Sequence, residues 1–211
     1  MSVLVYTESW NGSFRKSTFE AVSYANETAK LLGTDVIAVS LGEVSDSELS
    51  KLGNYGASKV VSIATIEKGD SQSTTNAIAN LANDASAIIF SNTYTAKMIA
   101  PRLSVKLKIG AITNVIEIAS NTSPFTVKRK AFSTKAIEVA TVNSEKAILS
   151  ISPNSFGLIE TGGSCTIETA ESSEKGEITI KGQETLSGKI SISEAAAESE
   201  NMPKQASLSS R

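Results

Sequence analysis

The residues from Asn92 to Thr95 combine the side chains and the position best suited to ligand binding in this chain. They follow an apolar run, AIIFSN (87–92), and precede AKMIAPRLSVKL, a segment with helical spacing. The first backbone amides of a helix have no acceptor within the helix, and they attract anions when they face the ligand edge of a sheet. We therefore treat Asn92, Thr93 and Thr95 as weak candidates for an anion site. The alternative is that this helix end binds only water or a capping side chain.

The residue types that the chain lacks exclude several kinds of catalysis. It contains no histidine and one cysteine, Cys165. Nucleophiles activated by histidine, and zinc sites built from imidazoles or several thiolates, are therefore excluded. We interpret Cys165 as an incidental thiol, because a reactive cysteine needs a setting that stabilises its thiolate. We expect no catalytic residues and no metal site.

Neither the aspartates nor the glycines form a recognisable binding motif. The first apolar run is followed by TESWNGSFRKS, which is neither G-x-G-x-x-G nor a Walker-type loop, so the sequence does not support a standard dinucleotide or ATP site. Four aspartates lie near helix starts and turns, where aspartate is common as a cap. They are Asp35, Asp46, Asp70 and Asp84.

The composition is that of a globular protein without a strong charge preference. The chain has 211 residues, of which 40% are hydrophobic and 20% charged, and its net charge is −2. Without a dense basic patch we expect no nucleic acid partner. No apolar run reaches the roughly 18 residues that span a bilayer, and the opening MSVLVYTES has no signal-peptide pattern. We expect a cytoplasmic protein that does not insert into membranes.

Through residue 92, apolar β-branched runs alternate with segments of helical spacing. We expect strands at 2–9, 35–42, 59–65 and 87–92, and helices at 17–32, 46–52 and 71–84. Ser17, with Glu20 three residues later, predicts a capping box at the first helix start. The alternation predicts an α/β fold: a three-layer, Rossmann-like parallel sheet with helices on both faces, similar to adenine-nucleotide α-hydrolases. Ligands should then lie at the loops 8–16, 42–45, 65–71 and 91–97.

Pro101 interrupts the fourth helical segment. A proline inside a helix removes one hydrogen bond and costs about 3 kcal/mol. We therefore predict that Pro101 lies in the first turn of the main helix, after a looser turn at 95–100.

The second half reads as extended segments. AITNVIEIA predicts a strand, PFTVKRKAFSTKAIEVATVN a hairpin with its turn near Ser133 and Thr134, and AILSIS (147–152) a further apolar strand. One or two weak strands follow, and then a tail rich in Ser, Glu and Ala. We expect an α/β domain over residues 1–188, with the hairpin as an edge extension, and a polar linker over 189–211.

Several of these segments carry a family resemblance. AKMIAPRLSVKLKIGAITNVIEI, with Pro-Arg-Leu inside a helix and Ile-Thr-Asn-Val before a strand, resembles the N-terminal domain of electron transfer flavoprotein α subunits. SVLVYTESWNGSFRKSTFEAVSYANETAKLLGTDVIAVSLG is similar to the family's first strand, exposed loop and first helix. FTVKRKAFSTKAIEVATV is similar to its hairpin, where an arginine such as Arg129 and an aromatic such as Phe132 recur, and AILSISPNSF matches the strand that follows. The resemblance covers about residues 2 to 190.

The resemblance implies an electron carrier rather than an enzyme with its own substrate. Proteins of this family are αβ heterodimers that take electrons from dehydrogenases onto FAD and pass them to a membrane-bound quinone oxidoreductase or another acceptor. Their α subunit holds most of the FAD contacts in a C-terminal domain, which we do not find in this sequence. We therefore expect FAD in the full complex, none bound to this chain alone, and either a truncated chain or a split gene product.

The resemblance also implies a scaffold and interface role. On the hairpin, the basic run 128–130 and Phe132 form a cluster of the kind that interfaces use. Lys128, Arg129 and Phe132, together with Arg102 on the main helix, are our candidates for contact with the family's β subunit. The alternative is a merely solvated hairpin.

Some positions depart from the family pattern. The hairpin turn reads Ser133-Thr134-Lys135 where the family usually has a glycine, and Ser152 stands where an arginine is common. The family's β subunit binds AMP through glycine and acidic residues around loops equivalent to 92–97, which this chain lacks there. We therefore interpret the anion site of Asn92, Thr93 and Thr95 as vestigial.

Two other classes of function stay open at this point. One is a stand-alone adenine-nucleotide-binding module, because parallel α/β domains often hold AMP or ATP at their strand ends. The other is a purely structural docking scaffold. Tight nucleotide binding would raise the Tm, which distinguishes the two.

Overall fold

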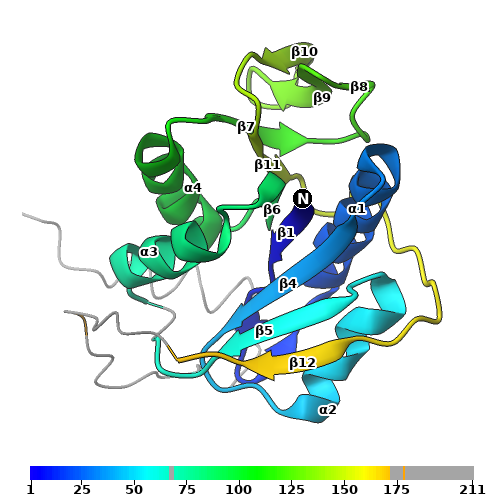
Figure 1. Ribbon diagram of the computed structural model, residues 1–211. Helices are drawn as coiled ribbons and strands as arrows, with labels where there is room; N and C mark the ends of the chain where they lie inside the picture. The colour runs from blue at the N-terminus through cyan, green and yellow to red at the C-terminus, as the bar shows by residue number, and fades with distance from the viewer. Residues whose placement is uncertain (67–68, 172–177, 179–211) are drawn as a thin grey trace, which may run out of the picture. The chain divides into compact units, whose positions relative to one another are not determined.

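A mixed sheet with a parallel centre organises the protein (Figure 1). The computed structural model describes residues 1–66, 69–171 and 178, and these lie in one compact unit, Met1–Thr179. In this part of the chain the parallel strands run in the order β7 (Gly110–Val115), β11 (Ala147–Ile151), β6 (Ala85–Ser91), β1 (Ser2–Tyr6), β4 (Asp35–Leu41), β5 (Lys59–Ile63) and β12 (Thr166–Thr169). Antiparallel strands extend the β7 edge: β9 (Phe125–Ala131), β10 (Ala136–Val142) and β8 (Asn121–Thr122). A separate small ribbon pairs β2 (Ser9–Trp10) with β3 (Ser13–Phe14).

Helices cover both faces of the sheet, which confirms the predicted α/β architecture. Helix α1 (Lys16–Leu32), α2 (Asp46–Leu49) and the 3-10 helix η1 (Ser50–Tyr55) pack on one face, and α3 (Ser71–Leu81) and α4 (Tyr94–Leu107) on the other (Figure 1). Within the described residues, none of these helices has the length and apolar character needed to cross a membrane.

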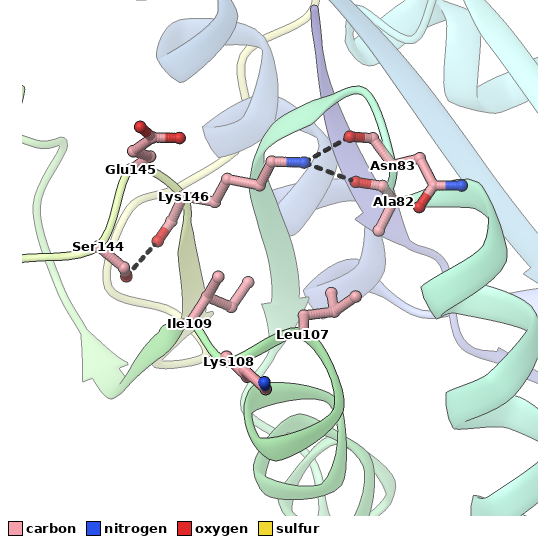
Figure 2. A pocket seen from close by; sticks show the side chains of 8 residues that line it. All are labelled: Ala82, Asn83, Leu107, Lys108, Ile109, Ser144, Glu145 and Lys146. Atoms are coloured by element: carbon pink, nitrogen blue, oxygen red, sulfur yellow. Dashed lines mark hydrogen bonds between the residues drawn. The ribbon is translucent and has the colours of Figure 1, made fainter.

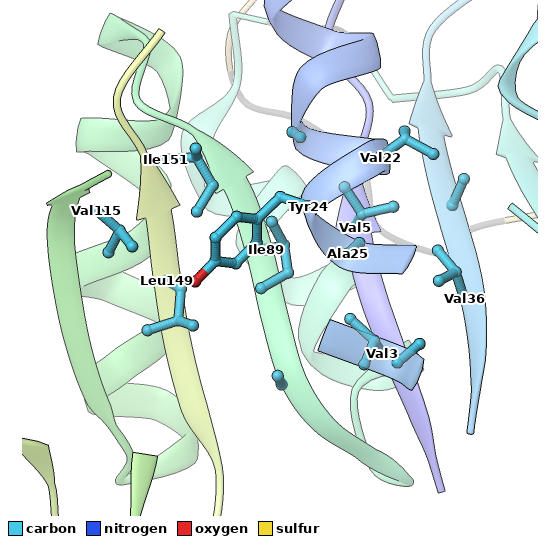
Figure 3. Packing of buried hydrophobic residues seen from close by; sticks show 14 of the residues in the cluster. Val3, Val5, Val22, Tyr24, Ala25, Val36, Ile89, Val115, Leu149 and Ile151 are labelled. Carbon is cyan, nitrogen blue, oxygen red and sulfur yellow. The ribbon is translucent and has the colours of Figure 1, made fainter. Parts of the chain in front are cut away.

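The core has two halves because neighbouring residues of a strand point to opposite faces. Val3 and Val5 of β1 pack under α1, where Tyr24 lies among Ile89 and Leu149 (Figure 3). Leu4 and Tyr6 pack under α3 and α4 instead. The central strands are therefore buried on both sides, as their continuous apolar runs indicate.

The start of α1 differs from the predicted capping box. The helix begins at Lys16, and its N-cap, Arg15, makes no side-chain capping bond. Thr18 donates its hydroxyl to the main-chain carbonyl of Glu8 at 2.8 Å. Glu20 does not turn back toward the helix start, because its carboxylate binds a distant segment of the chain.

That segment, residues 152–165, leads from β11 to β12 over α1, and we call it the strap (Figure 1). Glu20 is 1% exposed, and a carboxylate so far from water needs donors around it. Its two oxygens accept hydrogen bonds from the amides of Asn154, Phe156 and Gly157 at 2.7, 2.8 and 2.9 Å. Because the strap has no helix or strand of its own, these bonds fix its path across the helix.

Pro101 lies inside α4, at its eighth residue, so the prediction of a helix that begins near Pro101 was wrong. Thr93 is the N-cap, and the helix runs unbroken to Leu107. Ala96, Ile99 and Leu103 on the inner face of α4 are buried, whereas Pro101 faces solvent. Burial of the inner face thus offsets the hydrogen bond that the proline cannot make to the carbonyl of Lys97.

The second half of the chain forms the predicted hairpin, with β9 and β10 joined at residues 132–135. Phe132, Ser133 and Thr134 have φ values of 48°, 50° and 67°, in the left-handed region. Side chains disfavour that region by about 1–2 kcal/mol per residue. The missing glycine noted in the sequence therefore leaves a strained turn.

The domain boundary that we predict at residue 188 lies outside the described residues, as does the expected linker 189–211. Of the one or two weak strands expected after β11, the described part of the chain contains β12, which pairs with β5.

Replacing Glu20 tests its role as the anchor of the strap. We expect Glu20→Ala to lower the free energy of unfolding by about 3 kcal/mol or more, because three amides lose their acceptor. Urea denaturation followed by circular dichroism measures this. Glu27→Ala is the control: Glu27 lies on the same helix in a surface ion pair with Lys30, and its loss should cost less than about 1 kcal/mol. Equal effects of the two changes would contradict the anchoring role.

A glycine substitution in the hairpin turn should stabilise the protein and so tests whether the turn is strained. Thr134→Gly should raise the free energy of unfolding by about 0.5–1 kcal/mol, since relief of left-handed strain exceeds the entropy cost of glycine. Lys135→Gly, at a neighbouring position without positive φ, should lower it. If both glycines destabilise to the same extent in thermal unfolding, the turn is not strained as described.

Candidate functional site

The chain changes direction across the sheet at β1. It moves from β1 through α1 to β4 and β5, and then through α3 to β6 on the other side of β1. The loops after β1 and β6 therefore lead to opposite faces of the sheet, which creates the crevice where open α/β folds bind ligands. Two of the predicted ligand loops, 8–16 and 91–97, meet here.

The carboxylate of Glu8 occupies this crevice. The hydroxyl of Thr93 donates to Glu8 Oε2 at 2.6 Å, and the hydroxyl of Thr95 donates to Glu8 Oε1 at 2.8 Å. Both threonines stand at the start of α4, and Thr93 also caps it by accepting from the amide of Ala96 at 3.2 Å. The negative charge therefore lies at the positive end of the helix dipole, where it is stabilising.

This geometry bears on the anion site that the sequence suggested. Thr93 and Thr95 lie together at the start of α4, and the anion that they bind is a side chain of the same protein. Glu8 lay within a predicted ligand loop without being singled out. Its one sequence signal is an acidic residue shortly after the first apolar strand.

Asn92, the third candidate, lies outside this cluster. Its side-chain amide donates to Asn114 Oδ1, and its own Oδ1 accepts from the hydroxyl of Ser150 at 3.4 Å. Asn92 therefore links the ends of β6, β7 and β11 and takes no part in binding the carboxylate.

Little space remains beside Glu8. A hollow of about 240 Å³ is lined by Glu8, Trp10, Arg15, Tyr94 and neighbouring residues. The guanidinium of Arg15 lies over the Trp10 ring, 4.3 Å from its centroid. Drug-sized ligands typically occupy pockets of about 300–1,000 Å³, so this hollow is small for a nucleotide.

A larger hollow, about 330 Å³, lies at the amino ends of β6, β7 and β11, away from the crevice (Figure 2). Lys146 lines it and donates its ammonium group to the carbonyls of Ala82, at 3.3 Å, and Asn83, just beyond the end of α3. A lysine at the last carbonyls of a helix has a structural explanation as a C-terminal cap. We therefore place the candidate site at the Glu8 crevice.

The candidate interface residues fall in two places. Arg102 lies on α4, where its Nε donates to the hydroxyl of Ser71 on α3 at 3.4 Å. Lys128, Arg129 and Phe132 lie on the hairpin or its turn. The structure therefore keeps the hairpin residues together and separates Arg102 from them.

Both hairpin cations already have partners. Lys128 pairs with Glu117 at 2.9 Å. Arg129 donates to the carbonyl of Thr113 at 3.0 Å and pairs with Glu138 at 3.0 Å. Exposed ion pairs contribute at most about 1 kcal/mol, so these contacts orient the cations without removing them from the surface.

The apolar part of the hairpin is more exposed than the sequence suggested. Phe132, Ile137 and Val139 are 81%, 67% and 63% exposed, and we call them the hairpin patch. Ile137 and Val139 alternate on one face of β10, the edge strand in the described sheet. The sequence did not indicate that Ile137 and Val139 are exposed, because a strand with alternating apolar residues is expected to bury its apolar face.

Cys165 has the setting of an unreactive thiol. It lies against the carbonyls of Leu49 and Ser50, with sulfur–oxygen distances of 3.8 Å. Burial raises the pKa of this thiol above its ordinary value, so it stays protonated at neutral pH. No group of three or more potential metal-binding side chains (His, Cys, Asp or Glu) occurs in the part of the chain that the structure describes.

Comparison with known proteins identifies relatives for most of the chain. A family model described as "Electron transfer flavoprotein domain" matches residues 3–175. An electron transfer flavoprotein subunit alpha from Syntrophomonas wolfei is 28% identical over 163 residues, which cover 75% of this chain and 49% of that protein. The subunit alpha from Bacillus subtilis is 29% identical over 179 residues, 81% of this chain and 54% of that protein.

These matches confirm the resemblance found in the sequence. The chain spans about half the length of these curated relatives. The matched range reaches from β1 through β12 and includes both the Glu8 crevice and the hairpin.

Removal of the internal carboxylate tests the crevice. Glu8→Ala should lower the free energy of unfolding by about 2 kcal/mol, because two threonine hydroxyls lose their acceptor and α4 loses its anion. Chemical denaturation measures the change. The control, Glu43→Ala, removes an exposed carboxylate from a neighbouring loop and should alter stability by less than about 0.5 kcal/mol. The assignment fails if Glu8→Ala is as mild as the control.

Proposed function

This chain belongs to the electron transfer flavoprotein domain family, and we propose that it acts as the N-terminal domain of an α subunit. The observation that carries the proposal is the match over residues 3–175 together with two α-subunit relatives of about twice the matched length. In the complex, electrons pass from dehydrogenases to FAD and then to a quinone oxidoreductase or another acceptor. This domain supplies a scaffold and a subunit interface.

The crevice does not suit FAD. A flavin dinucleotide carries a diphosphate, and the helix start that would bind it already holds the Glu8 carboxylate. Two like charges at one helix end repel each other, and the adjoining hollow of about 240 Å³ is small. These residues support an FAD site outside the described part of the chain, mostly in a C-terminal domain. We derive no step of electron transfer through this crevice.

The same argument weighs against the stand-alone nucleotide-binding alternative. AMP and ATP would place their phosphates at the same helix start, beside Glu8. The domain instead fits an electron carrier without chemistry of its own. We propose that its α/β part covers residues 1–188, that residues 189–211 link it to the flavin-binding part, and that the complex is cytoplasmic.

We assign contact with a β subunit to the hairpin patch. An edge strand offers unpaired amides and carbonyls, which readily accept a strand from another protein. Phe132, Ile137 and Val139 supply apolar area beside it, and Lys128, which lies opposite Val139, borders that area. Arg129 lies opposite Glu138, on the other face of the hairpin. A buried aromatic centre with a charged rim is the usual anatomy of a protein interface. Arg102, on α4, falls outside this assignment.

Mutation of the hairpin patch tests the interface in the assembled complex. The full chain is mixed with a β subunit from the same genome and a flavin-binding α-subunit domain, and association is measured by analytical ultracentrifugation. Phe132→Ser combined with Ile137→Ser should weaken association by about tenfold or more, as expected for central interface residues.

The control is Leu31→Ser on α1, where an equally large apolar side chain is 54% exposed. It should leave association unchanged. Complete lack of association by the unaltered chain would overturn the proposed subunit role, whereas equal binding by the hairpin variant would overturn only the place of the interface.

A further inference from the structure

Helix α4 exposes a row of apolar side chains along its outer face. Tyr94, Met98, Pro101 and Val105 follow one another at intervals of four, three and four residues, which places them on one side of a helix. Tyr94, Met98 and Val105 are 85%, 48% and 79% exposed, and Pro101 is exposed as well. We call these residues the α4 ridge. A helix on the surface of a protein normally presents polar residues to water.

The charged side chains on α4 itself have one sign. Helix α4 contains Lys97, Arg102 and Lys106 and no acidic residue. The ammonium group of Lys97 lies 5.2 Å from the centre of the Tyr94 ring. Residues 71–110 include a single acidic residue, Asp84, which precedes the amino end of β6, although the whole chain has a net charge of −2. Helices α3 and α4 therefore carry three cations and no acidic residue. The carboxylates of Asp70 and Glu8 lie at the starts of these helices, where they already accept hydrogen bonds.

The surface beside the α4 ridge is hollowed. A groove of about 280 Å³ separates α4 from β7, and Ala96, Ala100 and Pro101 form its helical wall, with Ala111 and Thr113 opposite. Small side chains on both walls leave room for side chains from a partner. At the amino end of the ridge, Tyr94 borders the hollow that also contains Trp10 and Arg15. Tyrosine, tryptophan and arginine are the types most enriched at energetically important interface positions.

We propose that the α4 ridge docks an acidic, amphipathic segment of another protein. Its apolar residues would cover Met98 and Val105, and its carboxylates would pair with Lys97 and Arg102. The single sign of the charges on α4 is the argument for an acidic occupant. A second copy of this chain fits poorly, because symmetric pairing of two α4 helices would bring their cations together.

An anionic lipid surface fits less well than a protein. The apolar strip is one helix wide, and the neighbouring helix α3 presents Gln72 and Asn80 to solvent. Interfacial membrane binding needs a broader apolar face than this. The docking role also goes beyond the proposed function, since the ridge lies on α4 and the hairpin patch at the β10 edge.

The test uses the full chain and a synthetic helical peptide as the probe. The peptide, about 18 residues long so that it can form a helix, has leucines along one face and glutamates elsewhere, and its counterpart has lysine in place of every glutamate. Fluorescence anisotropy gives the affinities, and NMR chemical shifts locate the bound peptide. We expect the acidic peptide to bind at α4 with an affinity that falls as salt rises.

Two variants make the result specific. Met98→Glu combined with Val105→Glu should weaken binding of the acidic peptide by about tenfold or more. Leu31→Glu introduces the same charge at an exposed leucine of α1 and should leave it unchanged. Circular dichroism verifies that the variants keep their fold.

Four outcomes would overturn the proposal. The first is no binding of the acidic peptide, and the second is equal binding of the lysine peptide. The third is binding to phosphatidylglycerol vesicles without binding to the acidic peptide, which would assign the ridge to a membrane surface instead. Chemical shifts confined to the hairpin would likewise contradict the place of the site.

Discussion

The main constraint on this protein is that two carboxylates inside the fold, those of Glu8 and Glu20, each need hydrogen-bond donors from a distant part of the chain. Glu8 supplies the negative charge at the start of α4 through Thr93 and Thr95. Glu20 accepts three amides of the strap and so directs the chain from β11 to β12. Glu8 thus occupies the crevice where open α/β folds bind ligands. Glu20 fixes the strap, which leads the chain to β12, the last parallel strand that the structure describes.

Much of the fold can be predicted from the sequence, because hydrophobic periodicity and turn-forming residues depend only on neighbouring positions in the chain. Continuous apolar runs predicted the buried strands, and α1 ends at Gly33, which adopts the left-handed conformation that glycine readily takes. The predictions for Glu20 and Pro101 were wrong because both residues respond to contacts with distant parts of the chain. Glu20 left its expected capping box because its partners lie more than a hundred residues away. Pro101 stayed inside α4 because burial of Ile99 and Leu103 outweighs the lost hydrogen bond.

The candidate site was less predictable for the same reason. The sequence named Thr93 and Thr95 but placed the start of the main helix near Pro101. It also could not show that Glu8 reaches the two threonines, since β1 and β6 become neighbours only in the folded sheet. It likewise named Phe132 but missed Ile137 and Val139, because exposure depends on how far the hairpin extends from the body of the sheet. Family membership then supplies the functional context that neither periodicity nor geometry provides.

Glu8 fills the anion position of the crevice, and we therefore propose that the flavin is bound in another part of the complex. The most direct test is the visible absorption spectrum of the purified chain after incubation with FAD and desalting. We predict a colourless protein, because Glu8 occupies the anion position of the crevice. Flavin that stays bound at one equivalent per chain would contradict the account.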